Sequence, residues 1–294
     1  IYHNTGVGVH FENVNLHQSN VIGCHISYCR LGGIRVENCE VRNFQITGND
    51  IEYNNNRAHK VPDADAVPTA EIYFDVGQGS IREGTIASNT IQATYSPGGA
   101  NIRLIGAGKD QNHKMGMWTI AGNLIGSQHY NVWLTSVRDV TISGNMIYSG
   151  HGQNLLVEHS RNIVAGNNCF GHNPDYTQTE LCTGIRLVDS VDCSLSGSVI
   201  EDCRAGQHTV AEAVEQRKAS LVADDPVRRL QHPPHARRRR RDRQRRIASP
   251  QPVPIFWIVL RQPGPPLEPR DGFEVRAADL ALPRRRHSRP EGVL

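Results

Sequence analysis

The stretch that decides the fold is Asn131–Ile147, NVWLTSVRDVTISGNMI, because it recurs twice more without a gap. The later copies are Asn154–Phe170, NLLVEHSRNIVAGNNCF, and Gly184–Ile200, GIRLVDSVDCSLSGSVI. Each copy reads as a short strand with two inward apolar residues, a second such strand, a corner of Gly-Asn type, and one more apolar residue. A unit of this size cannot bury its apolar face alone, so the copies must stack as successive turns of a coil.

The corner can be followed along the chain as a column of seven residues. Its members are Cys24, Asn49, Asn89, Asn123, Asn145, Asn168 and Ser198. An apolar residue stands two positions after every member, and the two shortest intervals are 22 and 23 residues. The basic turn is therefore 22–23 residues long, with insertions elsewhere. Apolar residues alternate with polar ones in these segments, which indicates strands and not helices.

With these residues in hand, the chain resembles the right-handed parallel β-helix repeat proteins of the pectate-lyase-like superfamily. The resemblance covers roughly residues 6–203 and implies an all-β solenoid of about seven coils. The column then resembles the family's asparagine ladder, in which side-chain amides bond along the coil axis. Asn suits such a place because it tolerates left-handed backbone and its amide both donates and accepts hydrogen bonds.

The chain changes character after Cys203. Residues 1–203 carry a net charge of −7 and all seven cysteines, whereas residues 204–294 carry +10 and 12 of the 16 prolines. We therefore expect a β-helix over 1–203 and an Arg/Pro-rich low-complexity tail over 204–294 that adds no coil. The run Arg237–Arg246 has nine charges in ten residues. Three interpretations stay open: a disordered solvated tail, an out-of-frame translation, and a basic arm for nucleic acid.

The chain opens at Ile1 inside an expected strand, without a signal peptide or a cap, which predicts an N-terminally truncated β-helix. No apolar run reaches the length of a membrane span. The seven cysteines form no CxxC pair, which favours buried thiols over a metal site. Cys182 and Cys203 flank one coil and are the pair to test for a disulfide.

Alternation along the first strands predicts outward residues that stack from coil to coil. One row comprises Arg35, Tyr73, Arg103, Trp133, Leu156 and Arg186, and a second comprises Glu37, Asp75, Ile105, Thr135, Glu158 and Val188. A third outward row is expected from Glu71, Asn101, Asn131 and Asn154. Trp and Tyr stack on sugar faces and Arg pairs with carboxylates, so Arg35, Tyr73, Arg103, Trp133 and Arg186 are predicted to bind an acidic glycan.

The candidate catalytic residues belong to two chemistries. Glycoside hydrolysis needs two carboxyl groups about 5–9.5 Å apart, and Glu37 and Asp75, expected on adjacent coils, are the pair that could qualify. A lyase needs a base, and often Ca²⁺ to neutralise the uronate. Lys60, Lys109, His113 and Lys114 lie in the two long insertions, where any of them could serve.

Gly150-His151-Gly152, with Arg186 one coil later, resembles the Gly-His-Gly and Arg elements of polygalacturonase-type hydrolases. That resemblance implies a catalytic role for His151. The catalytic Asp residues of that family are missing from the preceding coil, NVWLTS, and the Asp-Pro-His-Asp motif of alginate epimerases is absent.

The sequence therefore predicts an extracellular or periplasmic carbohydrate-active β-helix. Its leading activity is a polysaccharide lyase or glycoside hydrolase with no obligatory cofactor, Ca²⁺ being an option. The rival is a non-catalytic β-helix that binds glycans or acts as a spacer. Nucleic-acid binding through the basic tail is a third hypothesis, and no membrane partner is expected.

Overall fold

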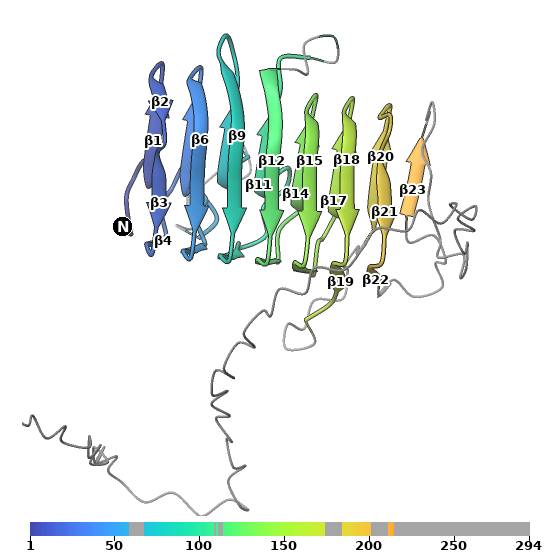
Figure 1. Ribbon diagram of the computed structural model, residues 1–294. Coiled ribbons are helices and arrows are strands. Elements are labelled where there is room, and N and C mark those ends of the chain that lie inside the picture. The colour runs from blue at the N-terminus through green and yellow to red at the C-terminus, as the bar shows by residue number, and fades with distance from the viewer. Residues whose placement is uncertain (59–67, 109, 111–113, 174–183, 201–210, 215–294) are drawn as a thin grey trace, which may run out of the picture. The chain divides into compact units, whose positions relative to one another are not determined.

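A computed structural model shows a parallel β-helix, in which strands of successive coils lie side by side (Figure 1). It describes residues 1–58, 68–108, 110, 114–173 and 184–200, and the backbone of 211–214. The strands form three parallel sheets, and each coil contributes to all three in turn. Within these ranges, no helix is long and apolar enough to cross a membrane.

Sheet 1 contains the first strand of each coil and follows the chain in order. Its strands are β1 (Val9–Glu12), β5 (Ile34–Glu37), β8 (Ala70–Asp75), β11 (Ala100–Ile105), β14 (Tyr130–Thr135), β17 (Gln153–Glu158), β20 (Ile185–Val188) and β23 (Ala211–Val214). Strand β23 pairs in parallel with β20, past the boundary predicted at residue 203. One strand of sheet 1 therefore lies beyond that residue. Residues 215–294, including the Arg-rich run, lie outside the described residues, so the interpretations of the tail stay predictions.

Sheets 2 and 3 complete each coil. Sheet 2 comprises β2 (Asn15–His17), β6 (Glu40–Thr47), β9 (Ser80–Ala87), β12 (Met115–Ala121), β15 (Arg138–Ser143), β18 (Arg161–Gly166) and β21 (Ser194–Ser196), with β3 (Asn20–Ile22) also paired to β6. Sheet 3 comprises β4 (His25–Ser27), β7 (Asp50–Glu52), β10 (Thr90–Gln92), β13 (Leu124–Gly126), β16 (Met146–Tyr148), β19 (Cys169–Gly171) and β22 (Val199–Ile200).

The predicted inward residues form the core. In the coil that begins with β14, Val132, Leu134, Val140, Ile142 and Ile147 are all fully buried. Toward the N-terminal coils the core includes a column of aromatic rings in edge contact. Its members are Phe11, Phe44, Phe74 and Trp118, with ring centroids 4.8 to 5.9 Å apart. Together these inward residues form one continuous apolar core, and its burial supplies the main stabilisation of the stack.

The predicted asparagine ladder is confirmed. Asn145 Nδ2 donates to Asn168 Oδ1 (3.0 Å), and Asn145 Oδ1 accepts from both the backbone and side-chain nitrogens of Asn123. The same bonds join Asn49 to Asn89 and Asn89 to Asn123. The ends are the predicted ones, because Cys24 N donates to Asn49 and Asn168 N donates to Ser198 Oγ.

One detail of the corner differs from the sequence-based expectation. The left-handed backbone belongs to the residue before each ladder position and not to the ladder Asn. This neighbouring column is Gly23, Gly48, Ser88, Gly122, Gly144, Asn167 and Gly197, all with positive φ. Glycine predominates there because it lacks the Cβ that makes this conformation costly. The role of the ladder Asn is instead to provide an amide, which donates to one neighbouring coil and accepts from the other.

The cysteines of the described residues are free thiols. Cys29, Cys39 and Cys193 are buried, as the sequence predicts, while Cys24 and Cys169 are half-buried. The proposed pair Cys182 and Cys203 lies outside the described residues.

Candidate functional site

The outer face of sheet 1 carries the two predicted outward rows in register. Arg35, Tyr73, Arg103, Trp133, Leu156 and Arg186 are direct partners from strand to strand. Glu37, Asp75, Ile105, Thr135, Glu158 and Val188 follow in the same register. Neighbouring strands are about 4.8 Å apart, so each row places one side chain per coil along the face.

Arg103 and Trp133 form the most tightly organised part of this face. The Arg103 guanidinium lies 3.5 Å from the centre of the Trp133 ring, and its Nη1 donates to Thr135 Oγ1 (2.8 Å). Trp133 Nε1 donates to Glu158 Oε2 (2.7 Å), which also accepts from Thr135 Oγ1. Burial lowers the pKa of Arg103 to about 10, against the opposing charge of Glu158. The Arg103 guanidinium is therefore charged at neutral pH, and its contacts with Trp133 and Thr135 fix its position.

Arg35 and Glu37 form a second fixed pair two strands away. Arg35 donates to both carboxylate oxygens of Glu37 at 2.7 and 2.9 Å, and its guanidinium lies 4.7 Å from the centre of the Tyr73 ring. His10 Nε2 lies 3.0 Å from Glu37 Oε2. Burial alone would raise the pKa of Glu37, but the hydrogen bonds and charges of Arg35 and His10 hold it below its usual value. Glu37 is therefore an anion at neutral pH.

Asp75 lies beside Glu37 on the next strand, as the sequence predicts. It accepts hydrogen bonds from the Tyr73 hydroxyl at 3.1 Å and from the Gly77 amide at 3.0 Å. Burial, together with the charge of Asp75, raises the pKa of Tyr73 to about 12. Tyr73 therefore keeps its proton and acts as a hydrogen-bond donor and an aromatic surface.

An aromatic wall stands on the turns that lead from sheet 3 into sheet 1 and on the first residue of β14. We use the name for Tyr95, His129, Tyr130 and His151. Tyr95 lies 4.2 Å from His151 and 5.8 Å from His129 between ring centroids, and His129 stacks on Tyr130 at 4.4 Å. Tyr130 in turn lies 4.4 Å from Trp133. The wall is therefore continuous with the outward row.

The structure separates the remaining predicted residues from one another. His151 belongs to the aromatic wall, and Arg186 is exposed on β20, two strands beyond Trp133. Leu156, although in the outward row, is only 6% exposed. Lys60, Lys109 and His113 lie outside the described residues, and Lys114 is half-buried just before β12.

The prediction of a third outward row is wrong. Glu71, Asn101, Asn131 and Asn154 are at most 1% exposed and point into the coil. They occupy the corner where the chain enters sheet 1, and the interior there holds backbone carbonyls that need donors. Asn101 and Asn131 donate to Gly126 O and Tyr148 O of sheet 3. Glu71 is thus unavailable to a substrate, and its expected outward direction is corrected.

These corner residues form a second polar ladder, which sequence analysis missed. Asn101 Nδ2 donates to Asn131 Oδ1 (2.9 Å), and Asn131 Nδ2 donates to Asn154 Oδ1 (2.6 Å). Glu71 accepts from the Asn54 backbone nitrogen (2.8 Å) and Nδ2 (2.6 Å). Burial raises the pKa of Glu71 to about 8, although the Asn54 hydrogen bonds oppose the shift.

One group in the described part of the chain has the ligand spacing of a metal site. The ligand atoms of His25, Asp50 and Glu52 lie within 4.8 Å of one another on sheet 3. Imidazole suits transition metals, whereas Ca²⁺ prefers oxygen ligands. This group therefore does not match the Ca²⁺ site considered for a lyase. His25 Nδ1 already bonds Asp50 Oδ2 at 2.8 Å, and an ordinary surface ion pair accounts for the arrangement.

Sequence analysis also missed the aromatic wall. Three of its four members lie in turns of unequal length, so no fixed spacing marks them. A usable signal existed nearby: the position four residues after the asparagine column holds Tyr28 and Tyr53 in two coils, and their rings stack 5.5 Å apart. Reading that column would have shown that aromatic residues gather on the turns before sheet 1.

Comparison with known proteins supports the fold. Neither a search of curated proteins nor a search of solved structures gave a match. A family model described as "Right handed beta helix region" matches residues 72–220, just over half of the 294-residue chain. The match covers coils whose strands form three parallel sheets with an asparagine ladder at one corner. The chain therefore belongs to the right-handed β-helix family.

Proposed function

We propose that the outer face of sheet 1 binds an acidic polysaccharide. The observation that carries the proposal is the outward row in which cations and aromatic rings alternate at strand spacing: Arg35, Tyr73, Arg103 and Trp133. Guanidinium groups pair with uronate carboxylates, and aromatic faces stack on sugar rings. Both cations are held in place by neighbouring groups, which reduces the entropy lost on binding.

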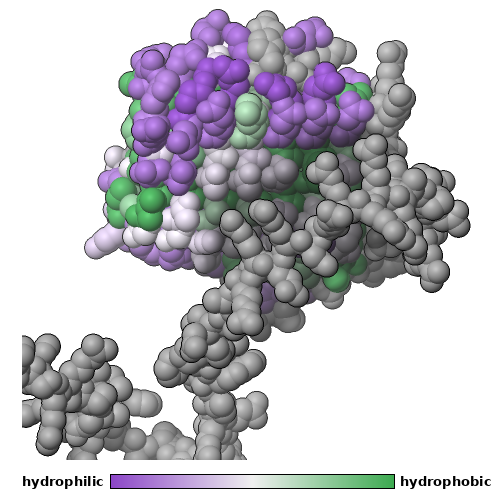
Figure 2. Space-filling model, viewed as in Figure 1, coloured by the Kyte–Doolittle hydropathy of each residue, from purple (hydrophilic) through white to green (hydrophobic). Residues whose placement is uncertain are grey.

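The face of sheet 2 offers a useful contrast. Figure 2 shows hydrophilic residues along its upper part and paler residues below. The residues on and beside sheet 2 include ion pairs such as Arg42–Glu40 and Arg161–Asp192, and the row Thr85, Thr119 and Thr141. The described strands of sheet 2 carry no outward Phe, Tyr or Trp. The mixture of arginine and aromatic residues thus favours sheet 1 as the binding face.

Cleavage of the bound glycan is the enzymatic form of this proposal. Glu37 and Asp75 are register partners on adjacent strands, whose backbones lie about 4.8 Å apart, so their side chains can bring the two carboxyl groups to the separation of about 5–5.5 Å found in retaining glycosidases. The lowered pKa of Glu37 suits the anionic partner of such a pair, and Asp75 is the second carboxyl group. Lyase chemistry would instead require a base such as Lys60 or His113. A non-catalytic glycan-binding role is the alternative, and the expected extracellular or periplasmic location fits either.

The test is to incubate the full chain with a panel of polyuronates and neutral polysaccharides. Release of new reducing ends without a rise in absorbance at 235 nm would indicate a hydrolase. A rise in absorbance at 235 nm, from an unsaturated product, would indicate a lyase. Binding without either signal would support the non-catalytic role. If hydrolysis is seen, Glu37→Gln and Asp75→Asn should each abolish it. Both variants should still bind the polysaccharide. Absence of both binding and cleavage across the panel would refute the proposal.

A further inference from the structure

His129 is held in one chemical state on the turn before β14. Gly98 N donates to its Nδ1 at 2.7 Å, so this ring nitrogen is an acceptor and the proton of the neutral ring is on Nε2. Burial lowers the pKa of His129, which favours the same neutral form. The imidazole therefore serves as the hydrogen-bond acceptor for the turn at residues 96–99.

The next coil packs directly against this ring. A Cβ atom at Gly152 would lie 2.3 Å from His129 Cδ2, so a larger residue there would have to displace the imidazole. Gly152 N also donates to His129 O at 2.8 Å, which holds the two turns together. This contact gives a structural reason for the second glycine of Gly150-His151-Gly152. The imidazole thus has no room to move toward the next coil.

A series of ring contacts joins His129 to the proposed binding face. Its imidazole stacks on Tyr130, with ring centroids 4.4 Å apart and an angle of 7° between the planes. Tyr130 lies 4.4 Å from Trp133, and the Arg103 guanidinium lies 3.5 Å from the centre of the Trp133 ring. His129 and Tyr130 therefore support Trp133 from the edge of sheet 1 at which strand β14 begins.

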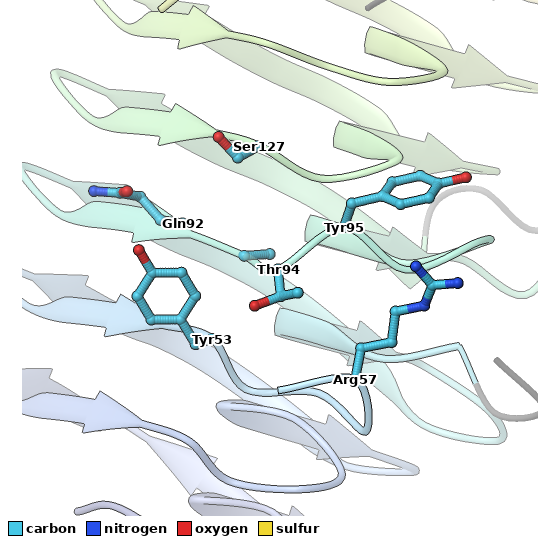
Figure 3. Close-up of a pocket in the computed structure, with 7 residues that line it drawn as sticks. Tyr53, Arg57, Gln92, Thr94, Tyr95 and Ser127 are labelled. Atoms are coloured by element: carbon cyan, nitrogen blue, oxygen red, sulfur yellow. The ribbon is translucent and has the colours of Figure 1, made fainter. Parts of the chain in front are cut away.

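The titratable and charged groups around His129 belong to neighbouring turns and to β14. Tyr95, on the turn before β11, lies 5.8 Å from His129, and Tyr130 is its stacking partner. His151, on the turn before β17, lies 4.2 Å from Tyr95. Figure 3 shows Arg57 beside Tyr95, and its guanidinium lies 5.4 Å from the centre of that ring. None of these four groups is negatively charged at neutral pH, so burial remains the dominant influence on His129.

We propose that His129 is a positioning residue of the glycan-binding face, which holds Trp133 in place only while its imidazole is neutral. A proton on Nδ1 would point at the Gly98 N–H, so two donors would face each other with their nitrogens 2.7 Å apart. Relief requires either that the turn at residues 96–99 moves or that the ring leaves its stack on Tyr130. Either movement changes the support of Trp133. The inference rests on the proposed function and adds its regulation by pH.

The first measurement is NMR of the full chain with ¹⁵N-labelled histidine and tryptophan. The His129 signals, identified by their loss in His129→Asn, should show the Nε2–H tautomer at neutral pH and a second protonation below the ordinary pKa of 6.5. The Trp133 indole signal, identified by its loss in Trp133→Ala, should shift over the same pH range. An Nδ1–H tautomer would overturn the inference, and so would a Trp133 signal that does not respond to the titration of His129.

The second measurement is the affinity of the full chain for a uronate oligosaccharide at about pH 7 and about pH 5. The carboxyl groups of the ligand resemble an α-carboxyl group, whose pKa is about 3.3–3.7, so the ligand stays ionised throughout. The affinity should fall about two- to tenfold at the lower pH, since the effect cannot exceed the one hydrogen bond that is lost. Equal affinities would overturn the inference. Absence of binding at neutral pH would instead refute the proposed function, and the NMR result would then decide whether His129 positions Trp133.

Two substitutions separate the acceptor from the ring. His129→Asn places an amide oxygen where Nδ1 lies, so it still accepts from Gly98 but cannot be protonated, and its affinity should be the same at both pH values. His129→Phe keeps the stack on Tyr130 but offers no acceptor, so at neutral pH it should bind as weakly as the unaltered protein does at the lower pH. His159→Asn is the matched control, directly after β17 at the opposite edge of sheet 1, and it should keep the full pH dependence. The inference is overturned if His129→Asn keeps that dependence as well.

Discussion

The Arg103 guanidinium lies 3.5 Å from the centre of the Trp133 ring, on the adjacent strand of sheet 1. The Trp133 face toward Arg103 is therefore occupied, and a sugar must use the opposite face or the ring edge. In the proposed complex the pair would act as one unit, in which the cation meets a carboxylate while the indole provides an apolar surface. The proposed binding face is therefore more sharply defined than an open aromatic platform would be.

Trp133→Ala should weaken binding of oligouronates roughly three- to twelvefold, the value of one aromatic contact. It should cost little stability, because Trp133 stands on the outer face. Leu134→Ala on the same strand should do the reverse and lower the unfolding free energy by about 2–5 kcal/mol, since Leu134 is fully buried. Calorimetric binding and thermal unfolding of both variants check this, and an unfolded Trp133→Ala with a silent Leu134→Ala would contradict the assignment of faces.

Arg103→Gln should reduce affinity for polyuronates about tenfold and leave affinity for neutral glycans nearly unchanged, because a charge-assisted bond is lost. Affinity electrophoresis in gels containing polygalacturonate or a neutral glucan measures both quantities. Arg42→Gln on sheet 2 is the control, since its side chain lies away from the proposed groove. Equal losses on both polysaccharides would show that Arg103 does not recognise the acid group.

Glu71 should make stability depend on pH. Its pKa in the folded protein is about 8, above the value of 4.5 expected when unfolded, so the fold favours the protonated form. Between about pH 4.5 and 8 the folded state therefore holds more protons than the unfolded state, and the unfolding free energy falls as pH rises. The total loss is a few kcal/mol, at about 1.4 kcal/mol per pKa unit.

Glu71→Gln should remove this dependence and raise stability above pH 8. Asn101 is the register neighbour of Glu71, and its buried Oδ1 has no donor within the described residues. A glutamine amide supplies a donor toward that position, and its oxygen still accepts one of the two hydrogen bonds from Asn54. Denaturant unfolding at pH 5, 7 and 9 checks the claim. Parallel pH profiles for the two proteins would mean that Glu71 does not titrate in this range.

Asn145→Ala should lower the unfolding free energy by about 2–5 kcal/mol, because it leaves buried groups of Asn123, Asn168 and Ile120 without partners. The exposed Thr141→Ala on the same coil should change it by less than about 0.5 kcal/mol. Denaturation midpoints of the two variants give the comparison. Similar small effects would show that the ladder does not stabilise the coil.

The sequence allowed the repeat, the asparagine ladder and two outward rows to be predicted, because alternation holds wherever a strand is straight. The alternation pattern gave the wrong direction for the side chains of four residues at the corner into sheet 1, which point inward: Glu71, Asn101, Asn131 and Asn154. Alternation carries no information about a corner, and a buried Asn cannot be told from an exposed one by type. The aromatic wall was missed because turns of unequal length bring its residues together, and the nearby signal, Tyr28 and Tyr53, lies in two other coils.

The most direct test of the central claim is the affinity of the full chain for a uronate oligosaccharide, measured beside the Trp133→Ala and Arg103→Gln variants. We predict that the unaltered protein binds, that each substitution weakens binding without changing the melting temperature by more than a few degrees, and that a neutral oligosaccharide of equal length binds less tightly. Binding that is indifferent to both substitutions, or no binding to any uronate oligomer, would contradict a glycan site on the outer face of sheet 1.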